Sequence, residues 1–329
     1  MESYVGYGIL GVIVLALMAF DLYSHRSEKE ISVKSAAIWS VFYIAAALGF
    51  ATYINFAYST EWAQLFLTGY ALEKVLAVDN LFAFMIIFGA FGIASKYQHR
   101  ILYWGILGAI VFRGIFVALG TTFTAILGPW ALLIFGLIIG WTAFKMLTKK
   151  EDEEDETVDY DNVWYIRWTR KILPVTSTVN GSKFFIKEKN AAGKLAWFAT
   201  PMFICLVAIE MTDIVFAFDS VPAVIAVTKE PYLVFSAMLF AILGLRSLYF
   251  VLEALRRVLT KLETMVIVIL AYIAGKLTVQ AGSELLHHHF QIGQPIHIDP
   301  VWSLGIVLAL LTTGVVWSLF TKPETEAAA

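Results

Sequence analysis

The chain has 329 residues, of which 59% are hydrophobic and 15% are charged, and its mean hydropathy is +0.75. Soluble domains contain about 45–50% apolar and about 25% charged residues, so this composition excludes an ordinary water-soluble protein. The net charge of -2 gives no basis for a nucleic-acid partner. One cysteine, Cys205, excludes a dithiol redox pair or a cysteine-rich zinc site within the chain.

Apolar segments long enough to cross a bilayer recur along the whole chain. A hydrocarbon core roughly 30 Å thick requires about 20 helical residues. We expect nine spans of this kind, at 5–23, 36–57, 64–92, 101–123, 126–147, 199–228, 232–255, 264–281 and 299–320. The composition and these segments predict an all-α polytopic membrane protein.

The basic residues alternate between the connections. Lysine and arginine follow the first, third, fifth and seventh spans, whereas the second, fourth and eighth connections contain neither and the sixth contains only Lys229. Because basic connections face the cytoplasm, the N-terminus is predicted outside and the C-terminus inside. The first span has no basic residue before it, which argues against a signal peptide.

The connection at 148–198 is long and opens with an acidic run, 151–156, so we expect a solvated, partly disordered cytoplasmic loop. It separates two similar halves. The predicted organisation is two peripheral N-terminal spans (1–57), a first three-span repeat (64–147), this loop (148–198), a second three-span repeat (199–281), and a final span with a short tail (299–329).

Ionisable and polar side chains lie inside segments that should face lipid. They comprise Glu73, Lys74, Asp79 and Asn80 in GYALEKVLAVDNLFAF, Glu210, Asp213, Asp219 and Ser220 in VAIEMTDIVFAFDSVPAV, and Arg113 and Arg246 in the spans that follow. Each charge at mid-membrane depth costs roughly 2.5–3.5 kcal/mol, which is hard to explain by stability alone. The pattern favours a transport or proton-relay site. Charge pairs that only hold helices together are the alternative.

The two clusters align without gaps. E-K-V-L-A-V-D-N matches D-I-V-F-A-F-D-S and pairs Glu73 with Asp213, Asp79 with Asp219, and Asn80 with Ser220. Since each unit has three spans, the second must be inverted relative to the first. Inverted repeats place the substrate site near the midplane, where Asp79 and Asp219 are expected to meet.

Helix geometry restricts how the acids can cooperate. Glu73 and Asp79 differ by about 120° in azimuth and about 9 Å along the axis, so a straight helix cannot turn both toward one ion. They mark two levels of one path, or the helix is unwound between them. Pro222, shortly after Asp219, predicts an unwound stretch whose carbonyls help to bind the ion.

Carboxylate, amide, hydroxyl and carbonyl oxygens suit Mg²⁺, Ca²⁺ or Mn²⁺. The histidine run 287–289 lies in the last outer loop, where it could bind a transition metal or simply be solvated. The chain has no Ser-His-Asp order, phosphate loop or redox motif, so we do not expect an enzyme or a prosthetic group.

Three stretches resemble the TerC/Alx family of bacterial membrane proteins: FLTGYALEKVLAVDNLF (66–82), IEMTDIVFAFDSVPAVIAVT (209–228) and LFAILGLRSLYFVL (239–252). The similarity extends over roughly residues 5–320. It implies a multi-pass protein of the bacterial inner membrane with the two-repeat plan of LysE-type exporters. The family is associated by name with tellurium resistance and is implicated in Mn²⁺ export and in supplying manganese to secreted enzymes.

By resemblance, the family's acidic positions fall on Glu73, Asp79, Glu210, Asp213 and Asp219, with Asn80 and Ser220 as polar partners. The leading hypothesis, which takes the role of the arginines from charge balance, assigns the roles as follows. Asp79 and Asp219 would be core ligands, Asn80, Ser220 and Asp213 would complete the site, Glu73 and Glu210 would act as gate or path carboxylates, and Lys74, Arg113 and Arg246 would be supporting charges. Ala237 and Met238 stand where many members have Ser-Asn.

The leading expectation is a secondary exporter of Mn²⁺ that works by alternating access, with Arg113 and Arg246 replacing the cation when the site is empty. Two alternatives stay open. One is a membrane-embedded partner that hands metal to the secretion machinery, and the other is a pH-linked ion or amino-acid exporter.

Overall fold

The computed structural model describes residues 4–24, 32–148, 163–176, 181–189, 194–255, 262–296 and 298–321. Its elements in these ranges are α1 (Tyr4–Ser24), α2 (Val33–Ala57), α3 (Thr60–Ala90), α4 (Ser95–Leu127), α5 (Pro129–Thr148), α6 (Trp164–Ile172), β1 (Phe185–Lys189), β2 (Leu195–Ala199), α7 (Pro201–Val227), α8 (Pro231–Leu243), α9 (Leu245–Leu255), α10 (Leu262–Phe290) and α11 (Pro300–Phe320).

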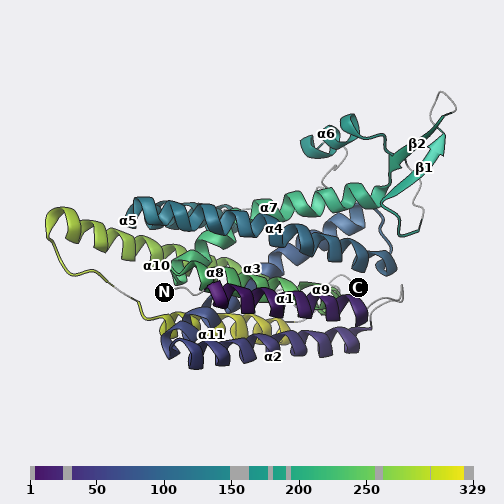
Figure 1. The fold of residues 1–329 in the computed structure, drawn as a ribbon. Coiled ribbons are helices and arrows are strands. Elements are labelled where there is room, and N and C mark those ends of the chain that lie inside the picture. The colour runs from purple at the N-terminus through teal and green to yellow at the C-terminus, as the bar shows by residue number, and fades with distance from the viewer. Residues whose placement is uncertain are drawn as a thin grey trace.

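The long helices lie side by side in one bundle (Figure 1). By length and composition, seven helices among the described residues could cross a membrane, or eight if α8 and α9 form one bent span. We expected nine spans. The difference is α3, because every window of 18 residues in it includes Glu73, Lys74 and a third charged residue. Its 31 residues extend about 46 Å, which is long enough to cross the bundle.

Local sequence fixes many of the helix starts. Pro129, Pro201, Pro231 and Pro300 are the first residues of α5, α7, α8 and α11. Proline is favoured there because its fixed φ suits the helix and its missing N–H would lack an intrahelical acceptor anyway. Ser59 caps α3 by accepting a hydrogen bond from the Trp62 amide at 3.1 Å.

The bundle has two distinguishable ends. α1 begins at the end from which α10 projects, and the hairpin of β1 and β2 lies at the opposite end (Figure 1). The strands are antiparallel, with Phe185 opposite Ala199. The predicted solvated loop at 148–198 therefore contains the short helix α6 and, after it, nearly all of the hairpin. The acidic run 151–156 lies outside the described residues.

The helix break is not where we expected it. α7 runs unbroken from Pro201 to Val227 with Pro222 inside it, so the predicted unwinding next to Asp219 is wrong. One proline removes a single backbone hydrogen bond, and a packed helix can tolerate that loss. The break lies at Gly244, where α8 and α9 meet at an angle of 52°.

Three apolar clusters form the core, and two of them meet in the middle of α4 and α7. On α4 the clusters end at Ala109 and begin again at Val117, and on α7 they end at Ile209 and begin again at Ala217. Arg113 and Asp213 fall in these two gaps. The fold therefore places a polar layer between two apolar clusters, at mid-depth in the bundle.

Candidate functional site

Arg113 of α4 is buried in the polar layer and joins α3 to α7. Its guanidinium donates to Glu73 through Nη1, and to Asp213 through Nε at 3.2 Å and Nη2 at 2.9 Å. The exposed fractions of Arg113, Glu73 and Asp213 are 2%, 1% and 4%. Forked pairing of a guanidinium with both carboxylate oxygens offsets part of the desolvation cost. This Glu73–Arg113–Asp213 triad fixes three helices relative to one another.

Two uncharged side chains complete the polar layer. Asn80 is buried, and the amide orientation that satisfies both of its ends accepts from Arg113 Nη2 at 3.0 Å and donates to the Leu76 carbonyl at 3.1 Å. Ser220 is also buried, and its hydroxyl lies beside the Glu73 carboxyl group. Predicted partners from both halves of the chain therefore gather around the triad.

Glu210 lies one helical turn before Asp213 on α7 and faces α4. Its carboxyl group occupies the space that a side chain at Gly108 would need, and Oε1 lies 4.0 Å from the position of a Cβ at Gly105. Its Oε2 is buried and has no hydrogen-bond partner among the described residues. The two glycines of α4 thus form a notch that holds a second acidic group next to the triad.

Of the two aspartates predicted as core ligands, Asp79 and Asp219, the structure describes the side chain of Asp79 alone. Asp79 is half-buried on the unbroken helix α3, about 9 Å along the axis from Glu73, so the two acids lie at different levels. The side chain of Asp219 lies outside the described residues. The meeting of Asp79 and Asp219 at one ion stays a prediction.

Lys74 supports the helix break. Its Nζ donates to the Ala241 carbonyl at 2.9 Å, in the last turn of α8, where carbonyls have no intrahelical donor. A Cβ at Gly244 would lie 2.7 Å from the same Nζ. A side chain at position 244 would therefore displace the lysine ammonium from this carbonyl.

Arg246 does not join the triad. Its Nη2 contacts Asp21 Oδ1 of α1 at 2.5 Å, and the exposed fractions of Arg246 and Asp21 are 3% and 6%. Sequence reasoning missed Asp21, because a lone aspartate near the end of an apolar span is normally a flanking residue. The signal that could have identified Asp21 was Arg246 itself, because a second buried arginine requires a buried acid as its partner.

Two cavities are lined by residues of α3 and α4, and the smaller of them includes Asp213 of the triad. A cavity of about 400 Å³ lies where α3 ends and α4 begins, with Gln98 and Glu253 on its wall. A smaller one, of about 20 Å³, is lined by Asp213, Arg246 and Gly105, among others, and can hold about one water molecule or one small ion. Phe88 and Tyr249, whose rings meet edge to face, line the larger cavity.

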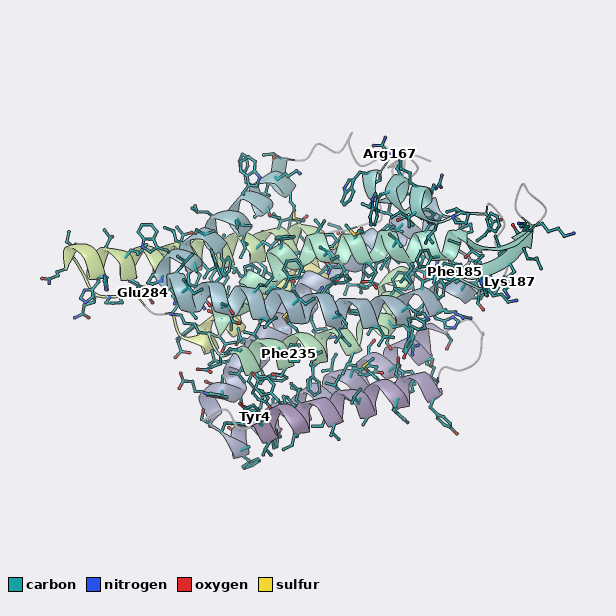
Figure 2. All side chains as sticks on the ribbon, turned by 45° about the horizontal axis from the view of Figure 1, so that its top comes forward. Tyr4, Arg167, Phe185, Lys187, Phe235 and Glu284 are labelled. Atoms are coloured by element: carbon teal, nitrogen blue, oxygen red, sulfur yellow. The ribbon has the colours of Figure 1, made fainter. Side chains whose placement is uncertain are left out.

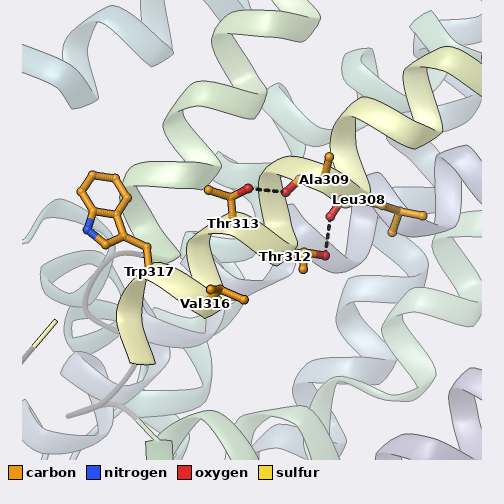
Figure 3. Close-up of a pocket in the computed structure, with 6 residues that line it drawn as sticks. All are labelled: Leu308, Ala309, Thr312, Thr313, Val316 and Trp317. Atoms are coloured by element: carbon orange, nitrogen blue, oxygen red, sulfur yellow. Dashed lines mark hydrogen bonds between the residues drawn. The ribbon is translucent and has the colours of Figure 1, made fainter. Parts of the chain in front are cut away.

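A groove of about 520 Å³ on α11 has a different character (Figure 3). Its two hydroxyls, on Thr312 and Thr313, donate to carbonyls of their own helix at 2.7 and 2.8 Å. These bonds leave the groove without a polar group directed at a ligand, so we do not regard it as the functional site.

The histidine run lies at the end of α10, far along the chain from the triad. His287 Nδ1 lies 2.7 Å from the Gly293 carbonyl, and the side chain of His289 is outside the described residues. Among the described side chains, no three of His, Cys, Asp and Glu are close enough together to hold a metal ion. In the triad, Arg113 stands between the two carboxylates.

Comparison with known proteins identifies relatives over nearly the whole chain. The chain is 44% identical to "Tellurium resistance protein TerC" of Serratia marcescens, with 99% of each chain covered. It is 34% identical to "Putative membrane-bound redox modulator Alx" of Escherichia coli (strain K12), covering 93% of this chain and 91% of the relative. No solved structure matches. Residues 58–326 match the model of the integral membrane protein TerC family, so the chain belongs to that family.

Proposed function

We propose that the protein is a secondary transporter that exports divalent metal ions, with Mn²⁺ as the favoured cargo, from the cytoplasm by alternating access. The observation that carries this proposal is the buried Glu73–Arg113–Asp213 triad. Ionisable groups at mid-depth in a membrane protein mark ion or proton pathways by default, because their burial is costly. Transport requires no bond chemistry and no prosthetic group.

The two carboxylates of the triad carry together the charge that one divalent cation would balance. Glu73 and Asp213 together carry two formal negative charges, and Arg113 balances one of them. A divalent cation would balance both once the guanidinium had moved away. The surrounding donors are carboxylate, amide and hydroxyl oxygens, which Mn²⁺, Mg²⁺ and Ca²⁺ accept.

In this proposal Arg113 is a counter-ion that alternates with the cargo. It holds the carboxylates when no metal is bound and withdraws when metal enters. Asp79 and Asp219 are proposed as further ligands, Asn80 and Ser220 as polar ligands, and Glu210 as a carboxylate on the path.

The helix contacts support an inverted-repeat plan, with α3 to α5 as one unit and α7 to α10 as the other. Under exchange of the units, the contact of α3 with α8 corresponds to that of α7 with α4, and both contacts are extensive. α5 packs on α10, where Gly136 allows close approach to Leu277. Glu73 and Asp213, which the repeat pairs with each other, bind the same arginine.

We propose that the hairpin end of the bundle faces the cytoplasm. The cavity of about 400 Å³ opens at this end, beside the connection that leads to Lys96 and Arg100. The positive-inside rule places such connections in the cytoplasm. Metal would then enter at Glu253, pass Phe88 and Tyr249, and reach Asp213 through the smaller cavity.

The names of the relatives concern tellurium resistance and redox modulation. The sequence contains one cysteine, Cys205, and it is fully buried. A dithiol of this chain therefore cannot carry a redox role, whereas a change in the cellular level of a redox-active metal could influence redox state indirectly.

The test is Mn²⁺ flux into liposomes that contain the purified protein, followed with a trapped metal-sensitive dye. Wild type should transport Mn²⁺, and Glu73→Gln should lose most of the flux. Glu61→Gln is the matched control, because Glu61 lies on the same helix but is exposed.

Two outcomes would overturn the proposal. Absence of flux in folded wild-type protein would favour a partner that delivers metal to secreted proteins. Flux that persists after Asp79→Asn combined with Asp219→Asn would favour a pH-linked ion or amino-acid exporter.

A further inference from the structure

The short helix α6 carries an apolar face that points away from the protein. Trp164, Trp168 and Ile172 have exposed fractions of 64%, 62% and 57%. They are spaced at i, i+4 and i+8, so each is rotated by about 40° from the previous one and all three share one side of the helix. We call this side, with its basic edge described below, the α6 outer face.

The opposite side of α6 fixes the helix against the bundle. Ile166 is fully buried in the same apolar cluster as Ile204 and Cys205 of α7, and Thr169 is also buried. α6 lies along the outer side of α7, near the hairpin end, in both views of the molecule (Figures 1 and 2). The orientation of the outer face therefore follows from packing on a candidate membrane span.

Basic side chains border the tryptophans. Arg167 and Lys171 are exposed, and helix geometry places them about 20–60° from Trp164 on the side away from Ile172. Figure 2 shows Arg167 at the outer edge of the molecule. Tryptophan at headgroup level beside lysine and arginine is typical of helices that lie at a membrane surface.

We propose that the α6 outer face binds anionic phospholipid, with its tryptophans and isoleucine among the acyl chains and its two basic residues on the phosphate groups. α7 is long and apolar enough to span a membrane, so lipid must cover its outer side, and α6 lies against that side. The charge of Arg167 and Lys171 complements an anionic headgroup. This inference requires only that the chain spans a membrane and is independent of what the protein transports.

The position of the face can be measured with a spin label. In a Cys205→Ala background, Ile172→Cys places the label on the outer face and leaves both tryptophans intact. Lys189→Cys, at an exposed position of strand β1, is the control. In bilayers that contain phosphatidylglycerol, we expect the label at position 172 to collide with oxygen and to be shielded from a water-soluble nickel chelate. Equal access of the chelate to both labels would overturn the proposal and leave the face free for a protein partner.

Headgroup selectivity is the second measurement. Phosphatidylglycerol or phosphatidylcholine is titrated into delipidated protein, and bound lipid is counted by native mass spectrometry. Arg167→Gln with Lys171→Gln should weaken the tightest phosphatidylglycerol site by about 25-fold, since each basic residue near anionic lipid contributes on the order of a fivefold effect and the two effects multiply. The control double variant, Lys183→Gln with Lys189→Gln on the hairpin side, should leave the affinity for phosphatidylglycerol unchanged. An equal loss in both double variants, or equal affinity of wild type for the two lipids, would contradict the assignment.

Discussion

The triad makes a quantitative prediction for Arg113→Met, a change that keeps an apolar stem of similar length and removes the charge. Glu73 and Asp213 would then face each other without a cation in a layer where both are at most 4% exposed. Removing one partner of a buried ion pair costs about 3–5 kcal/mol, because the remaining charge stays desolvated. We expect a loss of this size in the free energy of unfolding in detergent.

The same change, Arg113→Met, should make the stability of the protein depend on a divalent metal ion. If a divalent cation takes the place of the guanidinium, Mn²⁺ should stabilise Arg113→Met far more than wild type. At a concentration of 100 times the Kd, binding would restore about 2.7 kcal/mol, which is more than half of the expected loss. Thermal unfolding with and without Mn²⁺ measures both effects, with isothermal titration as a direct check on the Kd.

Arg100→Met is the matched control on the same helix. Arg100 donates to Ser182 Oγ at 2.8 Å and lies 5.5 Å from the ring centre of Phe184, near the end of the bundle. An interaction of this kind is worth about 1 kcal/mol or less. If Arg113→Met costs no more than the control, or if Mn²⁺ stabilises wild type and variant equally, Arg113 does not occupy the place of a cation.

Three further predictions follow from contacts outside the triad. Gly108→Ala should displace the Glu210 carboxyl group, cost about 1–3 kcal/mol and reduce Mn²⁺ flux, because the added Cβ occupies the same space. Asp21→Asn should destabilise the protein by about 3 kcal/mol in thermal unfolding, since it leaves the buried guanidinium of Arg246 without its carboxylate. Lys74→Met should cost about 1–3 kcal/mol by leaving a carbonyl at the end of α8 without a donor.

Each of these has a control. A Cβ at Gly114 would contact only the ring of Phe235, at 3.4 Å, so Gly114→Ala should be tolerated. Equal losses of stability and flux in the two glycine variants would contradict the role of Gly108 in holding Glu210. Asp21→Asn combined with Arg246→Met should recover much of the lost stability, and failure to do so would argue against a dedicated pair. Lys145→Met, on an exposed position of α5, should have little effect. A similar loss of stability in Lys145→Met would contradict the role of Lys74 at the end of α8.

The sequence by itself determined the class of protein, the approximate helix positions and most of the charged residues of the polar layer. Lipid cannot satisfy backbone N–H and C=O groups, so each span must be a helix and reveals itself as a local apolar run. The same runs make embedded charges such as Glu73 and Asp213 conspicuous, because nothing else in the segment is polar enough to compete with them. Asp213 was expected at the metal site and Glu73 on the path outside it, whereas in the structure both bind Arg113.

Only the tertiary structure decided which charge pairs with which. Arg113 and Arg246 occupy similar places in the two halves of the sequence, yet one binds two acids at mid-bundle and the other binds Asp21 of α1. Lys74, next to an acid in sequence, instead holds the last turn of α8 beside the break at Gly244. The free energy of a buried charge depends on the partner that packing brings within about 3 Å. These partners lie 40 to 225 residues apart, so no local pattern encodes them.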